Sequence, residues 1–353
     1  MPTTSNPKDA ITSEINSLRS QLNTLEKSTR LTEIRDAVED MQSNINGMKQ
    51  KISGLRSRGF VFGKDFETQA EHFSKQWAQM SPGIMSQINI QATRLQNAFT
   101  PVQQKSASLT SGNPNQARML LNQLKPQADS IASQASAAET QLKGMYNSFQ
   151  SQVSHLSGRL YEADFTLTQL EEASFQLLAT EAAVAAVKAV YVKDGKEDKE
   201  DPDGILFLTD QRLIFEQKEE IATKKILFIT TESQKVQKVQ FEAPIALVEK
   251  VETSKKGLFK NEDNIDVKFA PSAPFAQAQF HIWQDCGEWL ALINRVRTRD
   301  IDKERAVAVD AAAEAKVKSA PSQCPSCGGN ISQVVLRGQE NIKCEYCGFV
   351  IRL

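Results

Sequence analysis

Four of the five cysteines lie in two Cys-x-x-Cys pairs, and they are the residues best placed to do chemistry. Cys324 and Cys327 form the first pair, and Cys344 and Cys347 form the second. Residues 328–343, sixteen in all, separate the pairs, which is within the spacing of four-thiolate zinc sites. Because cysteine fills all four positions, no ligand position stays open for catalysis. The sequence therefore predicts one structural Zn²⁺ per chain.

A glycine follows each pair and supports a metal-binding turn. Gly328 and Gly348 give the backbone the freedom to close a tight turn whose amides point at sulfur. Residues 323–353 resemble a zinc ribbon with two rubredoxin-type knuckles, with strands at Ile331–Leu336, Asn341–Lys343 and Phe349–Leu353. A unit of about thirty residues needs its metal in order to fold.

Other uses of this cysteine cluster stay open. An iron site and a redox dithiol are alternatives to zinc. Nucleic-acid binding by the ribbon is a further alternative, but it is disfavoured because two acids offset the three nearby cations. These residues are Arg337, Lys343 and Arg352 against Glu340 and Glu345.

The remaining titratable candidates do not form a catalytic pattern. Cys286 stands alone, and His72 and His155 lie in helical stretches without neighbouring metal ligands. His281 alternates with apolar residues in a predicted strand, which indicates a position at the rim of a sheet. The chain has no nucleophile elbow, phosphate loop, zinc-protease motif or dinucleotide fingerprint. We expect no enzyme.

Composition limits the kinds of partner. The 353 residues carry 42 Lys and Arg against 43 Asp and Glu, so no global field recruits nucleic acid or anionic membrane. This length suits two or three domains. The N-terminus lacks the apolar core of a signal peptide, and the longest apolar run, Ala182–Val192, contains Lys188 and is too short for a membrane span. Two Cys-x-x-Cys pairs and one single cysteine suit a reducing cytosol better than a disulfide scaffold, so a cytoplasmic protein is expected.

The stretch Gly204–Glu216 organises the middle of the chain. Two β-rich runs flank the polar corner Thr209–Gln211, which predicts a tight hairpin. Both runs are apolar on two faces, as in strands of a closed or covered sheet. The run from Gly204 to Phe215 resembles the G-x-L-x-L-T-x-x-R-L-I-F signature of GRAM and bacterial pleckstrin-homology-like domains, a resemblance that extends over about residues 180–300.

That resemblance implies a pleckstrin-like barrel with one capping helix. Asp285 and Glu288 form a capping box, after which Trp289, Leu292, Ile293 and Val296 share one helical face. Seven or eight strands are expected in all. Besides the hairpin they lie at Glu181–Lys193, Lys225–Thr231, Val236–Phe241, Ile245–Thr253, Ile265–Phe269 and Gln279–Trp283.

The N-terminal half predicts helices. Residues 1–58 carry a heptad seam that slips by two residues between Leu25 and Leu31, so they form either a coiled coil between chains or amphipathic helices packed locally. Residues 60–178 predict a helical bundle or rod, in which Phe66, Phe73 and Trp77 belong to the core. Helix boundaries are expected at the prolines of residues 81–83, 111–114 and 125–126.

Two segments flank these domains. The cations Lys255, Lys256 and Lys260 with Leu258 and Phe259 could insert a loop into an anionic membrane surface, or the apolar pair could fold back onto the barrel. Residues 301–322 predict a helical extension followed by a hinge.

The sequence thus predicts a multidomain α+β chain: a helical or coiled-coil region, a pleckstrin-like barrel at 180–300 and a zinc ribbon at 323–353. We expect a non-enzymatic cytoplasmic adaptor that docks protein partners, with self-association through residues 9–58 left open. A peripheral membrane protein acting through the loop at 255–260 is one alternative. A nucleic-acid-associated protein acting through the ribbon is another.

Overall fold

The computed structural model describes residues 7–193, 195–226, 229–257, 261–273, 275–331, 333, 335–336 and 341–352. The chain divides into two compact units. Unit 1 contains Met1–Gln50 and Thr68–Ser157, and unit 2 contains Lys51–Glu67 and Gly158–Leu353. Compactness does not test whether the five sequence ranges fold independently, so those domain boundaries stay predictions.

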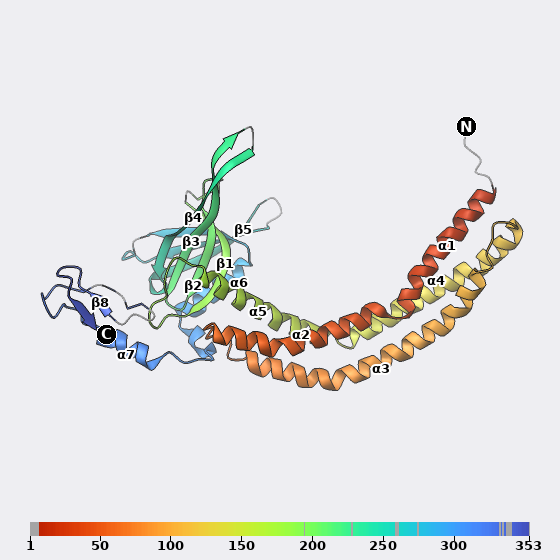
Figure 1. Ribbon diagram of the computed structural model, residues 1–353, viewed down its shortest axis with the longest axis horizontal. Coiled ribbons are helices and arrows are strands. Elements are labelled where there is room, and N and C mark those ends of the chain that lie inside the picture. Colours follow the sequence, from red (N-terminus) through yellow and green to blue (C-terminus); the bar gives the residue numbers. More distant parts are fainter. Residues whose placement is uncertain are drawn as a thin grey trace. The chain divides into compact units, whose positions relative to one another are not determined.

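Five helices make up the N-terminal half (Figure 1). In unit 1, α1 runs beside α4, and its apolar face packs against α3 as well. No helix in the described ranges has the length and apolar character to cross a bilayer. The helices are α1 (Pro7–Thr29), α2 (Thr32–Ser57), α3 (Phe66–Ser106), α4 (Pro114–Gly144) and α5 (Asn147–Glu171).

The heptad seam is buried by the chain itself. On α1, Ile11 and Leu18 belong to one core cluster with Phe99 of α3 and Leu124 of α4. The seam slips where α1 ends and α2 begins, at Leu31, whose φ is +52°. Burial within the chain favours the local bundle over a coiled coil between chains. The buried seam residues are Ile11, Ile15, Leu18, Leu22, Leu25, Leu31, Ile34, Val38, Met41, Ile45, Met48, Ile52 and Leu55.

One of the three helix boundaries expected at prolines is present, and two are not. The boundary at 111–114 is confirmed, since α4 starts at Pro114 with Asn113 as its N-cap. Those at 81–83 and 125–126 are wrong, because α3 continues through Pro82 and α4 through Pro126. Both prolines lie on exposed positions, so the carbonyl that loses its amide partner can turn to water while packing holds the helix.

The expected aromatic core is confirmed. Phe66, Phe73 and Trp77 are buried. Within unit 1, the Trp77 ring stacks on Phe149 at 5.4 Å, and Phe73 meets the same ring edge-on at 5.6 Å. The rings of Phe73, Trp77 and Phe149 thus pack α3 against α5.

Unit 2 is built on a seven-stranded antiparallel sheet in the order β4-β3-β2-β1-β7-β6-β5. The count agrees with the seven or eight strands expected, and β2 and β3 form the expected hairpin, while closure of the sheet into a barrel stays a prediction. The strands are β1 (Ala183–Val192), β2 (Asp203–Thr209), β3 (Arg212–Ile226), β4 (Ile229–Pro244), β5 (Val248–Lys256), β6 (Glu262–Phe269) and β7 (Gln277–Ile282).

Strands β2 and β3 are apolar on two faces because both faces are covered. Leu206 pairs with Phe215 on one face, among the aromatic rings of the sheet interior. On the other face Phe207 packs against Phe175, which follows α5, with the ring centroids 5.0 Å apart. The end of α5 and the residues after it therefore cover the second face of the sheet, which in many antiparallel sheets contacts solvent.

The stretch Lys225–Thr231 is not a strand of its own, which corrects the sequence expectation. Its described residues finish β3 and begin β4, so these two strands form one long hairpin (Figure 1). This run of large apolar residues between lysines and threonines has strand-forming composition but does not show where one strand ends and the next begins, and pairing decides that.

The helix after the sheet has the expected cap, but the extension beyond it differs. Asp285 accepts hydrogen bonds from Gly287 N and Glu288 N at the start of α6 (Cys286–Arg297). Beyond a 3₁₀ turn, Asp300–Glu304, residues 305–310 are not helical, and α7 covers only Ala311–Ser319. The continuous helix expected from residue 301 is wrong, because the amides of Ala306 and Val307 donate to Val61 O instead.

Candidate metal centre

The four cysteines predicted to bind metal lie together. Their sulfur atoms are all within 4.8 Å of one another, and the Cys324–Cys347 and Cys327–Cys344 pairs are both 3.7 Å apart. Four sulfurs at 2.3 Å from a central ion would form a tetrahedron with edges of about 3.8 Å. The donor set therefore fits a tetrahedral metal ion, with every coordination position filled by protein.

Two turns of the same design present these thiols. In the first, Cys324 N donates to Gly329 O at 2.8 Å and Gly328 N donates to Cys324 O at 2.9 Å. In the second, Cys344 N donates to Phe349 O and Gly348 N donates to Cys344 O, both at 2.9 Å. Gly328 and Gly348 have φ values of +72° and +75°, which a side chain would strain. The glycines thus serve the turns as the sequence predicts.

Backbone amides and neighbouring thiols shift the pKa values of Cys344 and Cys327 in opposite directions. The amide of Cys347, helped by that of Tyr346, lowers the pKa of Cys344 to about 7. The amide of Gly329 acts in the same direction on Cys327, but the neighbouring thiols, Cys347 first, outweigh it and raise the pKa of Cys327 to about 12. The first residue of the second pair, Cys344, thus has a lower thiol pKa than the second residue of the first pair, Cys327.

A two-stranded sheet carries the second turn. β8 (Asn341–Lys343) pairs with β9 (Val350–Arg352), with Ile342 opposite Ile351 and both buried. These strands are where the sequence places them. Of the expected strand Ile331–Leu336, Leu336 forms an isolated bridge with Leu178, and part of the stretch lies outside the described residues, as do Arg337 and Glu340.

The cationic segment predicted as a membrane or partner loop is only partly a loop. Lys255 and Lys256 end β5, and the ammonium of Lys255 lies 3.1 Å from Asp263 and 2.9 Å from Asp285. Lys255 and Lys256 therefore belong to a strand end and not to a loop tip, and the carboxylates of Asp285 and Asp263 raise the pKa of Lys255. Whether this segment contacts a membrane or a partner stays a prediction. Leu258, Phe259 and Lys260 lie outside the described residues.

The other candidates stay apart from the cysteines. His72 and His155 are exposed on helices. His281 bonds to Glu197 at 2.7 Å and stacks on Trp283, as a rim residue would. Cys286 is the first residue of α6 and is buried, and burial raises the pKa of its thiol. Within the described ranges, the four cysteines are the one group of three or more potential metal ligands.

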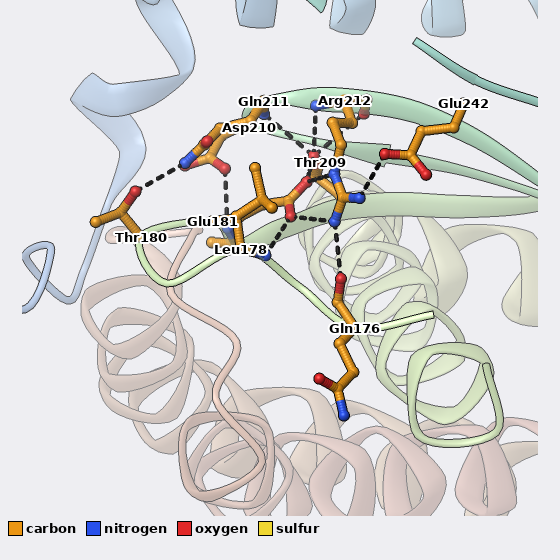
Figure 2. Close-up of polar contacts among 10 residues, drawn as sticks. Gln176, Leu178, Thr180, Glu181, Thr209, Asp210, Gln211, Arg212 and Glu242 are labelled. Atoms are coloured by element: carbon orange, nitrogen blue, oxygen red, sulfur yellow. Dashed lines mark hydrogen bonds and ion pairs between the residues drawn. The ribbon is translucent and has the colours of Figure 1, made fainter. Parts of the chain in front are cut away.

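A second polar cluster, which the sequence analysis does not find, lies at the corner of the β2–β3 hairpin (Figure 2). We call it the corner network. Its centre is the ion pair of Arg212 and Glu181, with Arg212 Nε 2.9 Å from Glu181 Oε1. Side-chain exposure is 9% for Arg212 and 0% for Glu181, so this pair is cut off from water.

Every charge in the corner network has several partners. Arg212 also donates to Glu242 at 2.7 Å and to Gln176 O at 2.9 Å, while Glu181 accepts from Leu178 N and from the Thr209 hydroxyl (Figure 2). Burial lowers the pKa of Arg212, but its two carboxylate partners outweigh this and raise it. A buried charge that is so fully paired stays ionised.

A second ion pair extends the corner network. Asp210 accepts from Ala182 N at 2.8 Å and pairs with Arg305, whose guanidinium also lies 5.0 Å over the Phe62 ring. Burial raises the pKa of Asp210 although the Ala182 amide and Arg305 oppose it. The corner network joins the β2–β3 hairpin to Glu181, which precedes the sheet in the sequence, and to Arg305, which follows it. Its charged members are held by one another and by backbone groups.

The same segment that supplies Glu181 also meets the metal-binding tail. Ala179 N donates to Val335 O at 2.9 Å, and Leu178 bridges Leu336. Val335 is buried. These are backbone contacts between segments far apart in the sequence, so no local pattern predicts them.

Comparisons with known proteins give fold neighbours only. Neither protein-family models nor curated proteins match the chain. Among solved structures, the chain is similar to the Vps36 N-terminal PH domain, with 14% identity over 36% of this chain and 94% of that one and a TM-score of 0.24.

Two further neighbours contain DH/PH domains. One is the DH/PH fragment of PDZRHOGEF in complex with human RhoA, with 10% identity, coverage of 84% and 96%, and a TM-score of 0.26. The other is the DH/PH domains of p115-RhoGEF, with 11% identity, coverage of 84% and 95%, and a TM-score of 0.20. At these scores the likenesses carry no functional argument, and no family is assigned.

Proposed function

We propose that this protein is a non-enzymatic adaptor that docks protein partners. One observation carries the proposal: the four-thiolate centre is closed, and the small module around it exposes large apolar side chains. With all four positions taken by cysteine, a bound metal has no position for substrate or water and serves to fold the module. Tyr346 and Val350 are 73% and 55% exposed beside it. A metal-folded module with an apolar surface suits binding rather than catalysis.

The proposed metal is zinc, one ion per chain. A closed four-sulfur tetrahedron accepts zinc or iron, and zinc is the usual structural ion in such sites. Elemental analysis of carefully purified protein separates the two, since an iron centre adds sulfur-to-iron charge-transfer absorption. Equimolar iron with that absorption would move the site to the rubredoxin-like alternative.

The seven-stranded sheet and the helical region are proposed as further docking surfaces of a cytoplasmic protein. The membrane alternative loses support, because Lys255 is held by Asp263 and Asp285. Self-association through residues 9–58 loses support as well, because the seam is covered within the chain.

Affinity capture tests the adaptor. The tagged full chain is isolated from its own cells, and co-purifying proteins are compared with those captured by a Cys344→Ser/Cys347→Ser variant and by the tag alone. We expect proteins that the wild type enriches over the tag, and a subset that depends on the ribbon. A wild type that enriches no protein over the tag would overturn the adaptor, and salt-sensitive retention on heparin or sedimentation with anionic liposomes would instead support the alternatives.

A further inference from the structure

The two metal-binding turns provide an internal comparison. They share the same pair of backbone hydrogen bonds, the same left-handed glycine and the same pattern of a buried first and an exposed second cysteine. Their other positions differ. Where the first turn has Ser326, Gly329 and Asn330, the second has Tyr346, Phe349 and Val350.

The large side chains of the second turn are therefore not required by the metal site. The first turn builds the same backbone and offers the same two thiols with small or polar residues in those places. Tyr346 makes one intramolecular contact of note, since its ring lies over Gly329, where an added Cβ would come within 2.7 Å. It is nevertheless 73% exposed, and Phe349 and Val350 are 45% and 55% exposed.

Exposure here is not a consequence of an absent core. The β8–β9 sheet buries Ile342 and Ile351 on one face. In the part of the chain that the structure describes, ten large apolar side chains are exposed, and three of the ten fall within residues 346–350. Such a concentration in one short stretch is typical of an interaction surface.

The charges around this stretch indicate the partner's chemistry. Lys343 lies opposite Val350 across the strands, and Arg352 lies two residues further along β9, so all three share the exposed face. Neither cation forms an ion pair with any described residue. The acid of this turn, Glu345, accepts from Gln333 at 3.2 Å.

We propose that Tyr346, Phe349 and Val350, with Lys343 and Arg352, form a docking face for an acidic segment of a partner protein that also carries apolar side chains. This inference rests on the proposed adaptor function and names the chemistry of its partner. The apolar side chains of the segment cover the second turn, and its carboxylates pair with the two cations.

A polypeptide fits this face better than a nucleic acid does. Two cations neutralise few phosphates, whereas nucleic-acid affinity grows with the number of phosphates contacted. The exposed side chains of Phe349 and Val350 offer apolar area that a phosphodiester chain cannot use. The sheet also has only two strands in the described part of the ribbon, so an extended segment can lie along its edge.

Fluorescence anisotropy with the full zinc-loaded chain tests the face. The probe is a labelled short peptide that alternates glutamate with leucine and phenylalanine, beside the same peptide with lysine for glutamate and a labelled oligothymidylate. We expect saturable binding of the acidic peptide alone. Tyr346→Ser/Phe349→Gly/Val350→Asn, which copies the first turn, should weaken it at least about tenfold with zinc content unchanged. Lys343→Glu/Arg352→Glu should do the same.

The matched control is Tyr161→Ser, which removes an equally exposed tyrosine from α5 and should bind like the wild type. The proposal is overturned if the acidic peptide fails to saturate the wild type by about 1 mM, binds the triple variant equally well, or is outcompeted by oligothymidylate. If the face fails while affinity capture still recovers partners, the adaptor function stands and only this surface is lost.

Discussion

The metal ribbon and the corner network are both clusters of polar side chains, but they are assembled at different distances along the chain. The ribbon collects its four cysteines from residues 324–347. The corner network collects Glu181, Arg212, Glu242 and Arg305, which span more than a hundred residues. The ribbon has little core beside Ile342 and Ile351, whereas the corner network is embedded in a sheet covered on both faces.

This difference shows where each region gets its stability. A small unit with two short strands depends on its metal, because burial alone cannot offset chain entropy at that size. In the sheet, apolar burial supplies the stability, and the corner network fixes which segments meet. Removing one of its charges is costly because the partner charge stays buried.

The largest expected effect is on the ribbon. Cys324→Ser, or chelation, should remove the metal and unfold residues 323–353, since structural zinc contributes about 10–16 kcal/mol to folding of such units. Limited proteolysis should then cut within this tail, while the thermal transition of the sheet and helices is kept.

Cys286→Ser is the control and should keep the zinc, because Cys286 is buried at the start of α6 and is not one of the four clustered cysteines. Less than about half a zinc per purified chain, or unchanged zinc in Cys344→Ser/Cys347→Ser, would contradict the assignment. Unfolding of the sheet and helices on chelation would contradict the claim that only the ribbon depends on the metal for its stability.

The next largest effect is expected in the corner network. Arg212→Ala leaves the Glu181 carboxylate buried without its guanidinium and should lower the free energy of unfolding by about 3–5 kcal/mol. Zinc content should not change. Denaturant titration monitored by tryptophan fluorescence measures the loss.

The double variant Glu181→Leu/Arg212→Met separates charge from packing. We expect it to be more stable than Arg212→Ala, because no buried charge is left alone. If Arg212→Ala unfolds at the same denaturant concentration as the wild type, water must reach the Arg212–Glu181 pair.

A smaller effect is expected at the end of β5. Lys255→Met should lower the melting temperature modestly, because Asp263 and Asp285 lose a shared cation, whereas Lys256→Met should leave it unchanged.

For the membrane alternative, Lys256→Glu should sediment with anionic liposomes as little as the wild type does. Clear sedimentation of the wild type that Lys256→Glu abolishes would revive that alternative.

The smallest effect is expected on the sheet surface. Lys250 and then Lys268 lower the pKa of Glu252 to about 2, below its ordinary value of 4.5. A depressed carboxyl pKa adds stability that is full above pH 4.5 and disappears as pH falls to about 2. Glu252→Gln should therefore melt slightly below the wild type at pH 7 and together with it near pH 2. Equal melting at both pH values would mean that solvent screens this exposed trio completely.

Local pattern was enough for the features whose residues are close in sequence. The spacing of Cys324 and Cys327, and of Cys344 and Cys347, predicts the two turns, because both members of each pair lie in one turn. The corner at Thr209–Gln211 and the Asp285 cap follow from residues within a few positions of one another. The heptad spacing predicts buried helix faces, but it leaves open whether the cover comes from the same chain.

Tertiary structure decided whatever depends on partners far along the chain. Packing of α3 and α4 covers the seam of α1, and helices continue through Pro82 and Pro126. Residues 305–310 are not helical, because Ala306 and Val307 donate to Val61 O. Tertiary structure also paired Glu181 with Arg212. Sequence by itself determines the turns and periodicities, because they depend on local backbone geometry, while the cover of an apolar face or the partner of a buried charge is settled only when distant segments pack together.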